Sequence, residues 1–269
     1  MGYLLILRPL NCLITAVSVV VGAWIGLPRI FNLQLLIGMI IGFFTCGFGN
    51  VLNDIYDIEI DSINAPHRPL PKGLVKKTYV ILEAIGLAVI SLILAILLSP
   101  RAFILVLIAL ILLLLYAGLL KKCWPANLVV ALLTGFSFLL GGIVNNNVAA
   151  LFPFAFSVLI HMPREIIKDL IDEAGDRAQG VITCAARIGS QRARILASIY
   201  LGMLVLILPL PFIFQTLNWR YMIVILVIAF PPIIYSIMRI MRQSAIPDLR
   251  VSSRILKFIM VAGLIAMII

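Results

Sequence analysis

The chain has 269 residues, of which 63% are hydrophobic and 12% are charged, with a formal net charge of +10. Since a soluble domain carries about 25% charged residues, this composition excludes an ordinary soluble protein and indicates a membrane protein. The basic excess alone could suggest a nucleic-acid partner, but its distribution along the chain, described below, argues for no nucleic acid and for contact with membrane lipids instead.

Apolar runs of about 18 or more residues are typical of membrane-spanning helices. Nine such runs follow one another along the chain: 10–27, 34–53, 78–98, 102–120, 127–145, 148–168, 194–214, 221–240 and 254–269. A membrane β-barrel would instead show short segments in which apolar and polar residues alternate. The sequence therefore predicts an all-α membrane protein with nine transmembrane helices, formed by a single domain, 1–269.

Most of the 11 acidic residues gather in two windows, directly after the second run and directly after the sixth. Both windows have the spacing D-x-x-D-x-x-x-D, and positions i, i+3 and i+7 share one face of a helix. Each window therefore forms a row of three carboxylates, which repel one another unless a cation joins them. We name them the first acidic stripe (Asp54, Asp57 and Asp61) and the second acidic stripe (Asp169, Asp172 and Asp176).

Clustered carboxylates suit Mg²⁺, which prefers oxygen ligands, keeps several waters and bridges to substrate phosphates. The six aspartates are thus both the predicted metal ligands and the candidate catalytic residues. The alternative is that each stripe is a solvated helix end that balances nearby basic loops. Metal binding is favoured because acids are nearly absent elsewhere and the same spacing occurs twice.

Each stripe opens a long polar segment, 54–77 in one case and 169–193 in the other. This weak repeat predicts two similar helical halves that face each other across a central cavity. Chance similarity between two polar helix ends is the alternative, and the repeat alone does not exclude it.

Lysine and arginine fall almost entirely in segments on one side of the predicted membrane; only Arg29, Arg101 and Arg220 lie on the other. Because basic residues concentrate in cytoplasmic loops, nine spans place the N-terminus in the cytoplasm and the C-terminus outside. Both stripes then face the cytoplasm of a multi-pass protein of the cell membrane.

Basic and amide side chains near the stripes are candidates for binding a diphosphate or phosphate. For Arg8 the alternative role is an interfacial anchor, for Lys121 and Lys122 it is topology alone, and for Asn50 it is a helix-packing hydrogen bond. The candidates are Arg8, Asn50, Asn53, Arg68, Lys72, Lys121, Lys122, Arg164 and Lys168.

The four cysteines, Cys12, Cys46, Cys123 and Cys184, have no paired spacing, so we interpret them as small buried hydrophobic residues and not as a disulfide or zinc framework. The lone His67 and His161 lack the spacing of metal ligands.

The two stripes, with Asn53 before the first, resemble the paired signatures of the UbiA superfamily of intramembrane prenyltransferases. The resemblance covers nearly the whole chain and includes three further segments: Arg8-Pro9-x-Asn11, Arg68-Pro-Leu-Pro-Lys-Gly73 and Tyr116-x-x-x-x-Lys121. It implies an all-α bundle around a central cavity with a cytoplasmic polar cap, and it adds Asn11 and Tyr116 to the substrate-binding candidates. It also implies Mg²⁺-dependent transfer of an isoprenyl group from a diphosphate donor to a lipophilic acceptor.

Arg164-x-x-x-Lys168 stands where relatives that act on aromatic acceptors often carry Tyr-x-x-x-Lys, and a guanidinium suits a phosphate-bearing acceptor. The resemblance is strongest to archaeal members that use a prenylated glycerophosphate acceptor. It implies transfer from geranylgeranyl diphosphate to the sn-2 hydroxyl of geranylgeranylglyceryl phosphate in ether-lipid synthesis. One departure is Cys184, where relatives usually carry Leu.

Two other functions stay open at this point. A prenyltransferase of the same family could act on an aromatic quinone precursor. A divalent-cation transporter could use the stripes as an ion path, although transport sites usually lie at the midplane and both stripes lie at predicted cytoplasmic ends. No residue stands out as a general base.

Overall fold

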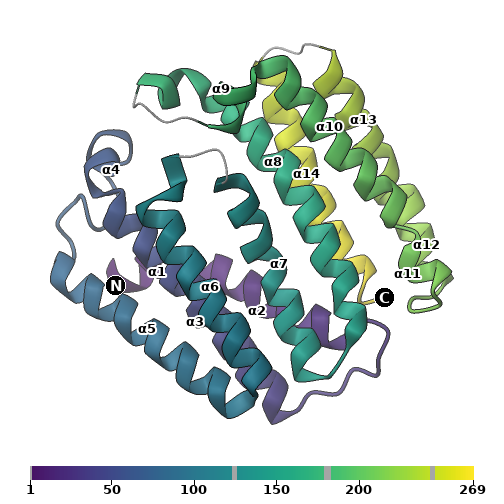
Figure 1. The fold of residues 1–269 in the computed structure, drawn as a ribbon, viewed down its shortest axis with the longest axis horizontal. Coiled ribbons are helices and arrows are strands. Elements are labelled where there is room, and N and C mark those ends of the chain that lie inside the picture. The colour runs from purple at the N-terminus through teal and green to yellow at the C-terminus, as the bar shows by residue number, and fades with distance from the viewer. Residues whose placement is uncertain (1, 123–125, 179–182, 243–245) are drawn as a thin grey trace. The chain divides into compact units, whose positions relative to one another are not determined.

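The structure is a computed structural model that describes residues 2–122, 126–178, 183–242 and 246–269; the side chains of Asn64, Lys122, 174–178 and Cys184 also lie outside the description (Figure 1). Every regular element in these ranges is a helix, as the sequence predicts. The chain forms two compact units, which are described separately.

Unit 1 comprises residues 2–23, Arg29–Leu119 and Phe136–Asn147. Within it α5 packs along α3, and α6 packs on both. Its helices are α1 (Gly2–Leu7), most of α2 (Pro9–Trp24), α3 (Leu33–Tyr56), α4 (Ile58–Asn64), α5 (Lys77–Leu98), α6 (Pro100–Gly118) and the later half of α7 (Ala126–Val144).

Unit 2 comprises Trp24–Pro28, the described residues of Leu120–Gly135 and those of Val148–Ile269. Within it α8 packs against α10 and α14, and α13 packs against both of these. Its elements are the short η1 (Leu120–Lys122) and η2 (Val148–Ala150), the first half of α7, α8 (Leu151–Ala178), α9 (Cys184–Ile188), α10 (Ser190–Ile207), α11 (Leu210–Ile213), α12 (Trp219–Val224), the π-helical η3 (Ile225–Ala229), α13 (Phe230–Met241) and α14 (Ile246–Ala266).

Polar side chains fix where several helices begin. Asn32 caps α3 by accepting from the Leu35 amide at 2.8 Å, and Ser99 caps α6 ahead of Pro100 by accepting from the Ala102 amide at 3.1 Å. Both arrangements satisfy a backbone N–H that has no partner inside its helix. Proline does not end every helix, since α8 continues through Pro163.

Among the residues that the structure describes, seven helical segments are long and apolar enough to cross a membrane, so the protein is a multi-pass membrane protein. They are Leu33–Tyr56, Lys77–Leu98, Pro100–Gly118, Ala126–Val144, Val148–Glu173, Ser190–Ile213 and Trp219–Met241.

The first and last of the nine predicted spans are not among these seven. The helix α2 has 16 residues, and α14 carries four charged residues, Asp248, Arg250, Arg254 and Lys257. The all-helical membrane class is confirmed, and the count of nine stays a prediction.

Two glycines let α2 and the later half of α7 touch through their backbones. A Cβ on Gly22 would collide with the Phe138 carbonyl, and a Cβ on Gly141 would collide with the Val19 carbonyl. Asn145 then donates from Nδ2 to the Ala23 carbonyl at 3.0 Å, which satisfies an acceptor at the end of α2. The position of α2 in unit 1 is therefore fixed by backbone contact and by a cap.

Candidate functional site

The first acidic stripe lies across a junction between two helices. The helix α3 ends at Tyr56, Asp57 adopts φ −90° and ψ 4°, and α4 begins at Ile58. An uninterrupted helix through the stripe, which the spacing assumes, is thus wrong at Asp57. Two hydrogen bonds keep the helical register across the junction: the Asp57 amide donates to the Asn53 carbonyl at 2.9 Å, and the Asp61 amide donates to the Asp57 carbonyl at 2.7 Å.

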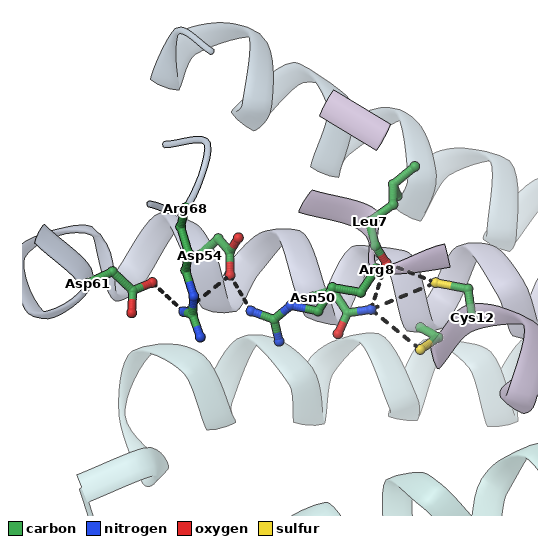
Figure 2. Close-up of polar contacts among 8 residues, drawn as sticks. Leu7, Arg8, Cys12, Asn50, Asp54, Asp61 and Arg68 are labelled. Carbon is green, nitrogen blue, oxygen red and sulfur yellow. Dashed lines mark hydrogen bonds and ion pairs between the residues drawn. The ribbon is translucent and has the colours of Figure 1, made fainter. Parts of the chain in front are cut away.

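Two arginines pair with two of the three carboxylates of the first stripe (Figure 2). Arg8 donates from Nη2 to Asp54 Oδ1 at 2.5 Å, while Arg68 pairs with Asp61 and lies 3.8 Å from the same Asp54 oxygen. Asp54 and Asp61 are only 3% and 6% exposed, and carboxylates so buried require a cationic partner. Both arginines were predicted to bind anions, and the structure places them together beside buried carboxylates.

Arg8 has an unusual backbone conformation that its neighbours hold in place. It separates α1 from α2 and has a φ of 52°, in the left-handed region that L-residues other than glycine rarely adopt. The carbonyl of the preceding Leu7 accepts from Asn50 Nδ2 at 2.8 Å and from Cys12 Sγ at 3.1 Å. Asn50 thus makes a helix-packing hydrogen bond, one of the two roles that the sequence left open.

Asn53 differs from Asn50 in that its side-chain oxygen, Oδ1, is buried without a hydrogen-bond partner among the described residues. A buried acceptor in this state costs free energy, and such atoms often mark a functional site. Asn53 lies one helical turn before the Asp57 junction, so this unpartnered oxygen belongs to the helical turn that leads into the first stripe.

The second acidic stripe lies near the C-terminal end of α8, in unit 2. Asn127, from the first turn of α7, donates from Nδ2 to Asp169 Oδ2 at 2.8 Å, while Asp172 is exposed. The side chain of Asp176 lies outside the described part of the structure. The sequence reading missed Asn127, for which the only signal is an amide at the start of an otherwise apolar run.

The two cations that precede the second stripe contact a different carboxylate. Arg164 donates from Nη1 to Glu165 Oε1 at 2.6 Å, and Lys168 Nζ lies 3.9 Å from Glu165 Oε2. Glu165 is buried, so it orients both cations at the level of the stripe. Glu165 is not among the site residues that the sequence predicts.

The remaining candidates are more scattered. Asn11 and Lys72 are exposed, whereas Tyr116 and Lys121 are partly buried and make further interactions. The side chain of Lys122 lies outside the described residues. The structure therefore groups Arg8, Asn50, Asn53 and Arg68 with the first stripe, and Arg164 and Lys168 with Glu165.

The donor chemistry of the described residues at the first stripe fits a hard divalent cation. Among the residues that the structure describes, no three His, Cys, Asp or Glu side chains converge as a metal site. The first stripe nevertheless offers two buried carboxylates, both already paired with cationic groups, and the unpartnered oxygen of Asn53. Oxygen donors of this kind suit Mg²⁺.

The sequence and the fold were compared with known proteins. The model of the UbiA prenyltransferase family matches residues 15–260. A digeranylgeranylglyceryl phosphate synthase of Methanocaldococcus jannaschii is 34% identical over 262 residues, covering 96% of this chain and 90% of that protein. A protein of the same name from Methanosphaera stadtmanae is 35% identical over 227 residues, covering 84% and 83%.

Solved structures of related proteins have the same fold as this chain. One structure of digeranylgeranylglyceryl phosphate synthase aligns with a TM-score of 0.89 and 32% identity, covering 99% of this chain and 96% of that one. A UbiA homologue from Archaeoglobus fulgidus bound to DMAPP and Mg²⁺ aligns with a TM-score of 0.73 and 20% identity, over 100% of both chains, and shows the shared fold.

These findings confirm the resemblance that the paired stripes carry, including the particular similarity to archaeal digeranylgeranylglyceryl phosphate synthases. The protein is an enzyme that transfers prenyl groups, and the chain belongs to the UbiA prenyltransferase family.

Proposed function

We propose that the protein transfers a geranylgeranyl group from geranylgeranyl diphosphate to the sn-2 hydroxyl of geranylgeranylglyceryl phosphate in archaeal ether-lipid synthesis. The names of the two relatives described above support this product. The observation that carries the proposal is the convergence of Arg8 and Arg68 on the buried carboxylates of Asp54 and Asp61.

A site that holds guanidinium groups next to carboxylates can bind a metal–diphosphate complex, because the carboxylates bind the metal and the guanidinium groups bind the diphosphate. Arg8 and Arg68 donate to diphosphate oxygens, and their planar forks match the geometry of phosphate. Lys72, Lys121 and Lys122 are further proposed contacts of the leaving diphosphate, while Asn11, Asn50, Asn53 and Tyr116 are proposed to line the donor site. Of these, Asn53 has the strongest structural support, because its side-chain oxygen is buried and unpartnered.

Mg²⁺ is the proposed cofactor, with the six stripe aspartates as its proposed ligands: Asp54, Asp57, Asp61, Asp169, Asp172 and Asp176. When bound, Mg²⁺ neutralises the charge that develops on the departing diphosphate. Asn127 and the Asn53 oxygen are positioned to support this role, because they lie beside a stripe carboxylate and one turn before Asp57, respectively.

The proposed reaction breaks the bond between the prenyl C1 carbon and the diphosphate oxygen. The diphosphate leaves with the bonding electrons, the acceptor hydroxyl oxygen forms the new ether bond to C1, and the hydroxyl proton is released. Arg164 and Lys168 are proposed to bind the acceptor phosphate, because Glu165 holds the arginine at 2.6 Å and lies 3.9 Å from the lysine. Departure of the diphosphate leaves positive charge on the allylic C1 carbon, and a site that excludes bulk water protects this carbon from attack by water.

The finer architecture is also proposed. We infer nine transmembrane helices around a central cavity, a polar cap on the cytoplasmic side, a cytoplasmic N-terminus and an external C-terminus. The distribution of lysine and arginine supports this topology.

Prenyl transfer by the purified protein tests the proposal. Labelled geranylgeranyl diphosphate and Mg²⁺ are supplied with either geranylgeranylglyceryl phosphate or 4-hydroxybenzoate. A doubly prenylated glycerophosphate that disappears on chelation of the metal supports the proposal. A product formed only with the aromatic acceptor would contradict the proposal and favour a prenyltransferase that acts on an aromatic quinone precursor. Metal flux into proteoliposomes without prenyl transfer would favour a transporter instead.

A further inference from the structure

Two cysteines that are distant in the sequence meet beside Arg8. Asn50 Nδ2 lies 3.7 Å from Cys12 Sγ and 3.7 Å from Cys46 Sγ, so one amide group contacts both sulfurs. Figure 2 shows Cys12 beside Asn50 and the Leu7 carbonyl. Both cysteines are free. The sequence predicts no disulfide framework, and both cysteines are free as expected, but spacing along the chain does not reveal that the two lie beside the same amide.

The pair is connected to the backbone that holds Arg8. Cys12 Sγ donates to the Leu7 carbonyl at 3.1 Å, and Asn50 Nδ2 donates to the same oxygen at 2.8 Å. Leu7 directly precedes Arg8, whose φ of 52° places it in a region that is unfavourable for arginine. A chemical change at the Cys12 sulfur therefore alters one of the two hydrogen bonds that hold the peptide group between Leu7 and Arg8.

The two sulfurs differ in access. Cys12 is 0% exposed, whereas Cys46 is only partly buried. An oxidant therefore reaches Cys46 first, and Cys12 is the neighbouring thiol that can resolve the product. Because both sulfurs contact the same amide nitrogen, rotation of the two side chains is the movement that a disulfide requires.

We propose that Cys12 and Cys46 form an oxidative modification site, which closes to a disulfide and thereby weakens the anchoring of Arg8. Hydrogen peroxide oxidises the Cys46 thiol to a sulfenic acid and is itself reduced to one water. The Cys12 thiol then attacks the Cys46 sulfur, the S–S bond forms, and a second water leaves. The disulfide removes the thiol hydrogen that Cys12 donates to Leu7, and a thiol reductant reverses the reaction.

Mass spectrometry of the full chain tests the chemistry. Cys123 and Cys184 are first replaced by serine, and the protein in lipid nanodiscs is treated with peroxide and digested without reduction. We expect a peptide pair linked through Cys12 and Cys46, with two hydrogens lost, and we expect dithiothreitol to reverse the link. Thiols that stay unmodified, or that oxidise separately to sulfinic acids without a link, overturn the proposal.

The effect on Arg8 is tested by activity, and this arm rests on the proposed function. Loss of one anchoring hydrogen bond is expected to lower prenyl transfer about tenfold in the oxidised protein, with recovery after dithiothreitol. Cys12→Ser and Cys46→Ser each retain a hydroxyl donor, so each single variant is expected to keep its rate in peroxide.

The two arms separate the possible failures. A fully linked protein that transfers at the unmodified rate overturns the coupling to Arg8. If the reduced protein transfers no prenyl group at all, the proposed function fails, while the mass measurement still decides whether the disulfide forms.

Discussion

The carboxylate of Asp54 is almost fully buried and contacts two guanidinium groups, so burial of its charge costs free energy that these two ion pairs offset. Asp54→Asn keeps the shape of the side chain but removes the negative charge. We expect prenyl transfer to fall about a hundredfold or more, the size of effect seen when one preorganised electrostatic contact is removed. Initial rates measured over a range of Mg²⁺ concentrations check this expectation.

Glu59→Gln is the matched control, because Glu59 is an exposed acid on α4 and not a member of the stripe. Its rate should stay within twofold or so of the unmodified protein, as for most surface substitutions. An equal loss in both variants would show that general charge near the membrane matters and that the stripe itself does not.

Asn127 makes a hydrogen bond of 2.8 Å to Asp169 from 42 residues away. Asn127→Ala removes a donor to a charged group, worth about 1.5–3 kcal/mol, so we expect turnover to fall by about tenfold or more and the Mg²⁺ requirement to rise. Titration of activity with Mg²⁺ measures both effects. Leu128→Ala, at a neighbouring exposed apolar position, should leave both unchanged.

At the residue scale, the sequence predicts side chains whose charge stands out from an apolar background. Arg8, Arg68 and the stripe aspartates were found in this way, and the structure pairs both arginines with stripe carboxylates. Asn127 and the thiol pair were missed, because their significance lies in contacts between distant segments. Spacing along one helix carries no information about such contacts.

Close packing of helices at glycine predicts how substitution of a glycine changes the stability of the protein. A Cβ on Gly141 collides with the backbone of α2, so Gly141→Ala should destabilise the protein by about 1–3 kcal/mol through overpacking. Gly86, within α5, has nothing within 4 Å of its Cβ position, so Gly86→Ala should be neutral or should stabilise by up to about 1 kcal/mol. Thermal unfolding of both variants in the same detergent gives the comparison, and equal melting temperatures would contradict it.

At the element scale, hydropathy predicts where helices exist but not where they begin and end. The runs at 78–98 and 102–120 correspond closely to α5 and α6, where Ser99 caps and Pro100 opens the second helix. The break at Asp57 was not predicted, because D-x-x-D-x-x-x-D reads as one helical face whether or not the backbone turns within it. Local backbone angles, and not periodicity, decide that point.

For the whole molecule, the number of spans determines where the chain ends lie. If both stripes lie at the cytoplasmic surface, as we propose, nine spans place the N-terminus inside and the C-terminus outside. If α2 and α14 do not cross, the remaining seven spans reverse both ends. We expect a reporter that is active only in the cytoplasm to function when fused to the N-terminus and to be silent at the C-terminus; the opposite result would remove the two outermost spans.

The junction at Asp57 has a consequence for the size of the ion that the first stripe accepts. Carboxylates on one rigid helix have fixed separations, which favour a single ionic radius. A set divided between α3 and α4 adjusts its separations through the backbone angles of one residue. We therefore expect Mn²⁺, a slightly larger ion with the same preference for oxygen, to support prenyl transfer in place of Mg²⁺. Such tolerance would let one enzyme work across environments that differ in their supply of divalent metals.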